Sequence, residues 1–393
     1  MSRLSTISLF FDAAAFLAVV LLLIFYFKKA TKLKELMMRM DIAKQEEKNK
    51  EKNEQITTED GEEKGKLIFM DGIEGGLELG DLLKASAEGL GNGNFGNCYK
   101  AMLDDRPAMV VKRLKDVKPL TSEEFANQLL FIAGLKHPNL LPVLAYYYSK
   151  DEKLVVYKYA QKGNLFSRIH GRRRVKDRIP FRWNARLSVA RGVARALEYL
   201  HLNSNSQTTL PHGNLKSTNV LLDDHDVVLV SDYGLSSLVS LPIASQRMVS
   251  YKSPEYQNAR RVSKKSDVWS YGCLLLELLT GRIPSHSAPS GTNGVELCSW
   301  VHQAVREEWT AEIFDLEISA QRGAAHGMVK LLELAIQCCD KSPEKRPEMT
   351  QVVREVENIR DVESSEDEDD LSSDPSLTDD SMTSAASVIN GHR

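Results

Sequence analysis

The sequence lacks an excess of basic residues and also lacks cysteines in C-x-x-C spacing. Its 393 residues carry 51 basic and 54 acidic side chains, which gives a net charge of -3. This balance argues against a general nucleic-acid binder. The five cysteines are odd in number, and none are spaced as C-x-x-C. The pattern therefore favours a reducing compartment and supports neither a disulfide framework nor a zinc site.

The composition is that of a globular chain. Apolar residues make up 42% of the sequence and charged residues 27%, which excludes a wholly disordered or fibrous protein. The length allows two to three domains, or one large two-lobed domain with tails. None of the histidines at positions 170, 201, 212, 225, 286 and 302 has metal-ligand spacing with cysteines or acids.

A long apolar run lies near the N-terminus, where residues 7–27 read ISLFFDAAAFLAVVLLLIFYF. As a helix it would span about 31 Å, or one hydrocarbon core. A buried core helix and a cleaved signal peptide are the weaker alternatives, because Lys28 and Lys29 follow the run in place of a cleavage site. We expect a single-pass membrane anchor, with the short segment 1–6 on the extracytoplasmic side.

The charges that flank this run predict its orientation. Residues 28–40 hold five basic residues and one acid, whereas Arg3 is the only basic residue before the run. The positive-inside rule then places the long C-terminal part in the cytoplasm. We expect residues 28–66 to form a charged tether. Its basic stretch 28–40 could bind anionic lipid, at about 1 kcal/mol per charge.

The rest of the chain divides into a globular part and a tail. Residues 67–360 have globular texture, and 361–393 are rich in acids and serine, which predicts a disordered tail. Strand signals concentrate before about residue 160 and helix signals after it. This order predicts a small sheet-rich lobe over about 78–160 and a larger helical lobe over about 161–360. The clearest elements are a strand at 154–157 and helices at 184–202, 267–279 and 352–359.

A glycine-rich segment, LGNGNFGNCYKA, carries Gly91, Gly93 and Gly96 in G-x-G-x-x-G spacing. Glycines let the backbone approach phosphates closely. A dinucleotide-binding fold and a kinase phosphate flap compete as interpretations. In the former a helix follows the glycines. Here the sequence that follows has strand composition, and a second strand then carries Lys112, an order that favours the kinase arrangement.

Further segments in order resemble a eukaryotic protein kinase domain. HGNLKSTN (212–219) resembles the catalytic loop, SDYG (231–234) the DFG segment and SPE (253–255) the APE segment, followed by SDVWSYG (266–272) and KRPEM (345–349). More closely, LELGDLLKASAEGLGNGNFG and LPHGNLKSTNVLLD are similar to plant leucine-rich-repeat receptor-like kinases. The best resemblance is to the branch of pollen receptor-like kinases and probable inactive receptor kinases, without the leucine-rich ectodomain.

The resemblance implies an α+β, bilobal protein kinase fold and an ATP site. In the family the glycine loop covers ATP, and Lys112 contacts its α- and β-phosphates. The implied nucleotide-binding residues are Gly91, Gly93, Gly96, Val110, Lys112, the hinge Tyr157, Lys158, Tyr159 and Ala160, and Leu221 on the pocket floor. Val110 stands where the family usually has alanine. The alternative for Lys112 is a solvated strand lysine.

The resemblance also implies Mg²⁺ as a cofactor. Asp232 and Asn219 would hold the metal ions, and Lys216 would neutralise the transferred phosphate. The alternative for Asp232 is a turn aspartate before Gly234.

The main departure from the family is Asn214, where the catalytic aspartate stands in active kinases. A carboxamide can orient a hydroxyl but cannot take its proton at neutral pH. Losing general-base assistance removes about 10²–10⁴-fold in rate, or about 3–5 kcal/mol of barrier. The loss is smaller if the loose transition state needs little proton removal.

Three further observations concern groups around the expected site. Gly213 replaces the arginine that many kinases use to bind a phosphorylated activation loop. Gln128 falls where the family has a glutamate that pairs with Lys112, although a shift of one turn would place Glu124 there. Asp267 and Arg346 are interpreted as structural, the first as the cap of a buried helix and the second as its ion-pair partner.

The sequence therefore predicts a receptor-like kinase-fold protein at the plasma membrane. We expect it to bind ATP and to be catalytically impaired, with Lys112, Asn214 and Lys216 in the catalytic positions. The alternatives are an active serine/threonine kinase and an adaptor that binds no nucleotide. The expected partner is an active receptor kinase or co-receptor, which phosphorylates serines such as Ser236 and Ser245 if these are more than ordinary loop residues. A basic run over 168–182 is either solvated or bound to an acidic segment.

Overall fold

The computed structural model describes residues 67–362, apart from 71–78, 94, 104–105, 172–178, 204–210, 240–250, 252, 260–261, 285–295, 308–312 and 322. The chain divides into two compact units, Met1–Lys64 and Gly65–Arg393, and all the described residues lie in the second. The expected anchor 7–27, the tether 28–66 and the tail beyond 362 lie outside the described residues. Within the described residues, no helix combines the length and apolar character needed to cross a membrane.

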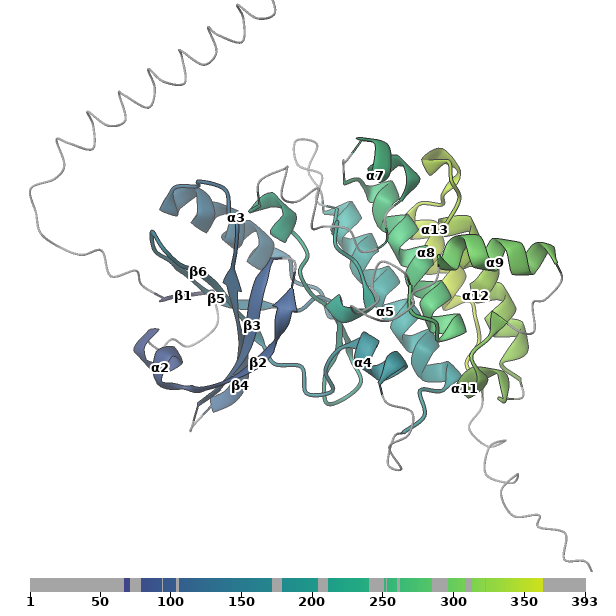
Figure 1. Ribbon diagram of the computed structural model, residues 1–393, viewed down its shortest axis with the longest axis horizontal. Helices are drawn as coiled ribbons and strands as arrows, with labels where there is room; N and C mark the ends of the chain where they lie inside the picture. The colour runs from purple at the N-terminus through teal and green to yellow at the C-terminus, as the bar shows by residue number, and fades with distance from the viewer. Residues whose placement is uncertain are drawn as a thin grey trace, which may run out of the picture. The chain divides into compact units, whose positions relative to one another are not determined.

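The first half of the described chain forms an antiparallel sheet with one long helix (Figure 1). The six strands pair in the order β1-β5-β6-β4-β3-β2. Their bounds, with those of the accompanying helices, are β1 Leu67–Phe69, α2 Leu79–Lys84, β2 Ser86–Gly93, β3 Gly96–Leu103, β4 Arg106–Leu114, α3 Ser122–Gly134, β5 Val143–Tyr148 and β6 Lys153–Lys158. The strand expected at 154–157 is confirmed, and β3 and β4 confirm that strands follow the glycine segment.

Alternation along β5 and β6 gives the sheet two apolar faces. Tyr146 and Val155 join the main core with Phe125 of α3, whereas Ala145 and Val156 form a second cluster. Successive side chains of a strand point to opposite faces, so period-two apolar sequence covers both sides. Helix α3 packs its apolar stripe on the main-core face and so stands beside the cleft that β3 and β4 border.

The second half is mainly helical (Figure 1) and includes a small two-stranded sheet, β7-β8. Its elements are α4 Leu165–His170, α5 Trp183–Leu202, η1 Ser217–Asn219, β7 Val220–Leu222, β8 Val228–Val230, η2 Leu235–Ser237, α7 Pro254–Ala259, α8 Lys264–Thr280, α9 Leu297–Arg306, α11 Leu316–Ser319, α12 Ala325–Cys338, η4 Pro343–Lys345 and α13 Met349–Glu357. The helices expected at 184–202, 267–279 and 352–359 are confirmed as α5, α8 and α13.

Helix α8 lies at the centre of the helical half. Ser263 caps it through a hydrogen bond that its side chain accepts from the Ser266 amide, and Gly281 ends it in the left-handed region at φ 60°. Fourteen of its residues are buried, because α5, α9 and α12 surround it. Because neighbouring helices cover α8 on all sides, its sequence is apolar all round, as predicted above for a buried helix.

Candidate functional site

A cavity of about 410 Å³ lies between the sheet and the helical half of the fold. Eleven of the residues expected at a nucleotide site line it: Gly91, Gly93, Val110, Lys112, Tyr157, Tyr159, Ala160, Lys216, Asn219, Leu221 and Asp232. Its size falls in the range of small-molecule sites, about 300–1,000 Å³. Residues far apart in sequence therefore share one cavity large enough for a nucleotide.

A buried ion pair occupies the floor of this cavity. Lys112 Nζ on β4 binds Asp232 Oδ1 directly, and both residues are only 6% exposed. Burial alone would lower the pKa of Lys112, but the charge of Asp232, with Cys98 and the hydrogen bond, raises it. Lys112 is therefore a fixed cation and not a solvated strand lysine.

The backbone aims Asp232 into the cavity. Its φ is 66°, in the left-handed region, which aspartate tolerates better than most residues. The next residue, Tyr233, is buried, and its hydroxyl donates to the Leu141 carbonyl oxygen at 2.9 Å. Burial raises the pKa of this phenol, so Tyr233 stays a neutral donor that anchors the segment. Asp232 is thus an inward-pointing carboxylate rather than an ordinary turn residue.

Helix α3 supplies no carboxylate to Lys112 in the described structure. Gln128 lies on its half-buried side, and its Oε1 is buried without a hydrogen-bond partner among the described residues. Glu124 closes a capping box, since its Oε2 accepts from the Thr121 amide at 2.9 Å and its own amide donates to Thr121 Oγ1 at 3.2 Å. The shift that would bring Glu124 to Lys112 is absent here, and Asp232 takes the place of the missing partner.

The segment around Asn214 is held by α8. Asp267 accepts hydrogen bonds from the His212 amide at 2.7 Å and from the Gly213 amide at 2.8 Å. Asn214 is 2% exposed and lines a separate cavity of about 20 Å³ beside Tyr251 and Asp267. The loop is firmly built, but its central side chain is an amide outside the larger cavity.

The interpretation of Asp267 and Arg346 as cap and ion-pair partner is wrong in its pairing. Ser263 caps α8, whereas Asp267 is buried further along and binds the loop backbone. Arg346 instead forms two hydrogen bonds with Glu255, each of 2.7 Å. Both residues are structural, but each holds a different segment. The sequence pattern could not assign partners across such separations.

Asn219 links the two loops that border the cavity. Its Nδ2 donates to the Asn214 carbonyl oxygen at 2.8 Å, and its own carbonyl oxygen accepts from Ser231 Oγ at 3.0 Å. Nearby, burial lowers the pKa of Lys216, although the charge of Asp232 opposes the shift. A carboxylate, an amide oxygen and a second cation therefore lie along one side of the cavity.

Three expected site residues lie outside the cavity lining. Gly96 has φ 144°, and a Cβ there would meet the Arg113 carbonyl oxygen at 1.8 Å. This glycine is therefore needed for the approach of β3 to β4. Lys158 is exposed because strand alternation turns it away from its neighbours Tyr157 and Tyr159. Asn214 faces the smaller cavity.

Sequence reasoning missed several residues of the larger cavity. They are Leu90, Asn92, Cys98, Leu141, Gly163, Asn164, Thr218 and Ser231. Burial raises the pKa of the Cys98 thiol, so this side chain is a small neutral part of the wall. Cys98 of β3 lies opposite Lys112 of β4, a pairing that depends on the strand register, and Leu141 enters from a connection with no pattern of its own.

A buried carboxylate lies beneath the two loops. Glu277 of α8 is fully buried and accepts hydrogen bonds from Ser217 Oγ at 2.8 Å and from the Tyr251 hydroxyl. His170 Nε2 lies 2.7 Å from Glu277 Oε1. Burial, followed by the charge of Glu277, raises the pKa of Tyr251 far above its usual value. Three separate segments therefore converge on one acid.

Comparison with known proteins places this geometry in context. The sequence pattern of the family described as "Protein tyrosine and serine/threonine kinase" matches residues 85–356. A probable inactive receptor kinase of Arabidopsis thaliana is 43% identical over 296 residues, which are 75% of this chain and 46% of that protein. Pollen receptor-like kinase 1 of Petunia integrifolia is 42% identical over 298 residues, or 76% of this chain and 40% of that protein. The chain thus spans less than half the length of these relatives.

Two solved structures are similar to this fold. One is the pseudokinase domain of BIR2, described as an immune regulator, with 29% identity and a TM-score of 0.64 over 75% of this chain and 90% of that one. The other is the kinase domain of maize SIRK1 bound to AMP-PNP, with 30% identity and a TM-score of 0.63 over 75% of this chain and 99% of that one. The sheet and the helical half correspond to the two lobes of this bilobal fold.

Proposed function

Since the chain belongs to the protein tyrosine and serine/threonine kinase family and is homologous to plant receptor-like kinases, we propose that it binds ATP in the larger cavity and transfers phosphate weakly or not at all. The observation that carries this proposal is the contrast within the cleft. Lys112 and Asp232 form a buried ion pair in the cavity, whereas the neighbouring catalytic position holds Asn214. The groups that would bind the nucleotide are present, but the carboxylate that would act as the base is missing.

The nucleotide would be held from both lobes. The backbone of the glycine segment at Gly91 and Gly93 would cover the phosphates, and Lys112 would bind two of them. The chain from Tyr157 to Ala160 would contact the adenine, with Val110 and Leu221 of the cavity lining on either side of it. The AMP-PNP bound to the maize SIRK1 kinase domain supports this assignment by analogy.

The donor set fits Mg²⁺, which prefers carboxylate and amide oxygens. Asp232 and Asn219 would hold it, and the bound metal would neutralise charge on the phosphates. Lys216 also lines the cavity and would add a positive charge for the terminal phosphate. Lys112 pairs with Asp232 Oδ1, so a bound metal ion would share this carboxylate with Lys112.

The side of the cleft that would bind the substrate hydroxyl, here called the acceptor side, would limit phosphate transfer. The Asn214 amide can accept a hydrogen bond from a substrate hydroxyl through its oxygen, but it cannot take the proton. Gln128 carries no charge to hold Lys112 in place of Asp232. We propose that the output is regulated docking, in which nucleotide binding closes the lobes and an active receptor kinase or co-receptor performs the phosphorylation.

The proposed setting is the plasma membrane. Residues 7–27 would cross it once, residues 28–40 would lie against anionic lipid, and the kinase-like domain would face the cytoplasm. The domains proposed are those expected from the sequence, with a kinase-like domain over 67–360 and an acidic tail after it. The homologous receptor-like kinases support this assignment.

Calorimetry and thermal unfolding of the purified full chain test nucleotide binding. We expect ATP at 100 times its Kd to stabilise the fold by about 2.7 kcal/mol, with or without Mg²⁺. Tripolyphosphate, which lacks adenine, serves as the control and should stabilise the fold less. If ATP gives no heat and no shift in either condition, the nucleotide proposal is wrong and the adaptor alternative replaces it.

A further inference from the structure

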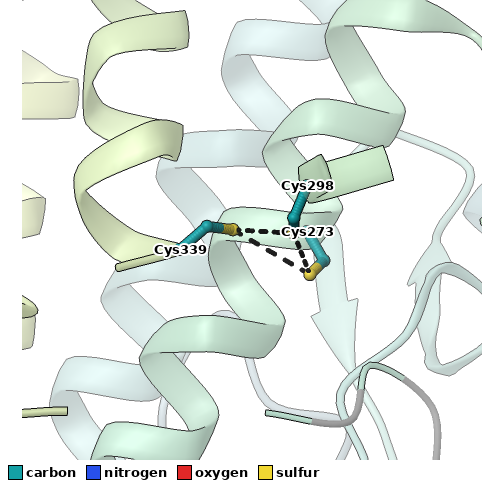
Figure 2. Close-up of side chains that lie close together, drawn as sticks. All are labelled: Cys273, Cys298 and Cys339. Atoms are coloured by element: carbon teal, nitrogen blue, oxygen red, sulfur yellow. Dashed lines mark hydrogen bonds between the residues drawn. The ribbon is translucent and has the colours of Figure 1, made fainter. Parts of the chain in front are cut away.

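Three cysteines meet where α8, α9 and the end of α12 pack together. Cys273 lies within α8, Cys298 is the second residue of α9, and Cys339 follows the last residue of α12. Figure 2 shows their sulfur atoms pointing toward one another. The Sγ atoms of Cys273 and Cys298 are 3.2 Å apart, those of Cys298 and Cys339 are 3.3 Å apart, and those of Cys273 and Cys339 are 3.9 Å apart. The three sulfurs form a closed triangle.

Ordinary packing explains a buried cysteine but does not require such a triangle. A free cysteine behaves as a small hydrophobic side chain, and Cys338, directly before Cys339, is fully buried in this way without joining the cluster. Cys273, Cys298 and Cys339 are 6%, 7% and 1% exposed. Apolar burial alone gives no reason for three sulfurs to share one point, whereas a common ligand does.

The surroundings of Cys298 favour a thiolate. As the second residue of the ten-residue helix α9, it lies at the positive end of the helix dipole. A divalent cation bound to three thiolates would leave one net negative charge, which the positive end of this helix would partly offset.

We propose that Cys273, Cys298 and Cys339 bind one zinc ion. Zinc accepts thiolate ligands at about 2.3 Å, and an ion at that distance from all three sulfurs would lie about 1 Å above their plane, as a tetrahedral geometry requires. Mg²⁺ and Ca²⁺ need oxygen ligands and do not match three sulfurs. The fourth position falls to a non-protein ligand such as water. None of these cysteines lines the nucleotide cavity, so the site is independent of the proposed function.

The zinc ion would join α8, α9 and α12 and would stabilise the helical lobe. The test uses the purified, reduced full chain, to which ZnCl₂ is added before unbound metal is removed and the bound zinc is quantified. We expect one zinc per chain and a higher unfolding temperature. Cys298→Ser should weaken zinc binding more than about 100-fold, because it removes a ligand rather than an outer partner. Cys338→Ser is the matched control and should retain one zinc.

A second readout needs no variant. Co²⁺ added to the wild-type chain should give a cobalt–thiolate charge-transfer band and tetrahedral d–d bands, and both should vanish when zinc is added. Absence of these bands, or unchanged zinc content in Cys298→Ser, overturns the proposal. So does a disulfide between any two of the three cysteines in the chain as isolated, detected by mass spectrometry.

Discussion

The two sides of the cleft differ in which functional groups they carry on an ordered backbone. On the nucleotide side, both the scaffold and the charged groups are present: Lys112 and Asp232 pair in a cavity of about 410 Å³. On the acceptor side the scaffold is equally complete, since Asp267 binds the backbone of His212 and Gly213, but the central side chain is the Asn214 amide. The comparison teaches that a backbone can keep its geometry after its chemical group has changed.

The largest expected effect comes from restoring the acceptor side. Asn214→Asp changes an amide to a carboxylate in a loop that is already held in place, so we expect phosphate transfer from radiolabelled ATP to rise by about 10²–10⁴-fold. Adding Gln128→Glu should increase the rate further, because it gives Lys112 a partner on α3 and frees Asp232. Asn127→Asp, an exposed change on the same helix α3, is the control and should have no effect.

An opposite result would remove the contrast between the two sides. If the wild-type chain already transfers phosphate at rates typical of active kinases, about 1–100 s⁻¹, and Lys112→Met abolishes that transfer, the chain is an active kinase. Asn214 would then orient the substrate hydroxyl without deprotonating it.

The next effect breaks the nucleotide side. Lys112→Met leaves the Asp232 carboxylate buried without its cation, which we expect to cost about 3–5 kcal/mol of unfolding free energy and to abolish ATP binding. Lys162→Met is the matched control, because Lys162 pairs at 2.6 Å with Asp226 where the side chains are 40% and 66% exposed. Exposed pairs contribute about 0–1 kcal/mol. Urea unfolding measures the unfolding free energy of both variants. Equal losses of unfolding free energy would show that the Lys112–Asp232 pair stabilises the fold no more than an exposed pair.

The smallest effect concerns protons on the acceptor side. Burial lowers the pKa of His212, although Asp267 and Asp232 oppose the shift. Below the ordinary histidine pKa of 6.5, the unfolded chain therefore binds a proton that the folded chain resists. Stability should fall as the pH drops from 7 to 5, with a slope of up to about 1.4 kcal/mol per pH unit from this group.

His212→Gln should flatten this slope, and the exposed change His225→Gln should leave it unchanged. The measurement is the unfolding free energy in urea at intervals between pH 5 and pH 7. A slope that stays the same in His212→Gln would contradict the assignment of a buried neutral imidazole.

Local pattern predicted the elements that carry the site, but not every contact. The periodicity of α5 and the apolar run of α8 predicted these helices. A helix buried on one side has apolar residues at helical spacing, and a helix buried on all sides is apolar throughout. The family resemblance implies that Lys158 is part of the hinge, and strand alternation turns its side chain outward. The role of Gly96 lies in strand packing, which depends on the carbonyl group of Arg113 in the next strand.

Contacts between distant segments had no signal in the sequence. Arg346 pairs with Glu255 rather than Asp267, a choice that three-dimensional packing alone determines. Cys273, Cys298 and Cys339 show no short spacing, and their convergence depends on how α8, α9 and α12 pack. Spacing rules detect ligands on one element, whereas ligands supplied one at a time by separate helices escape them.

Glu277 has a consequence for how the cleft can move. Its carboxylate receives Ser217 from the loop that carries Asn219, Tyr251 from the segment after the DFG-like turn, and His170 from α4. If any one of the three moves away, the fully buried carboxylate loses a hydrogen-bond partner that water is not placed to replace. All three segments are therefore held by one carboxylate. We expect this part of the cleft to keep its shape whether or not the chain is phosphorylated.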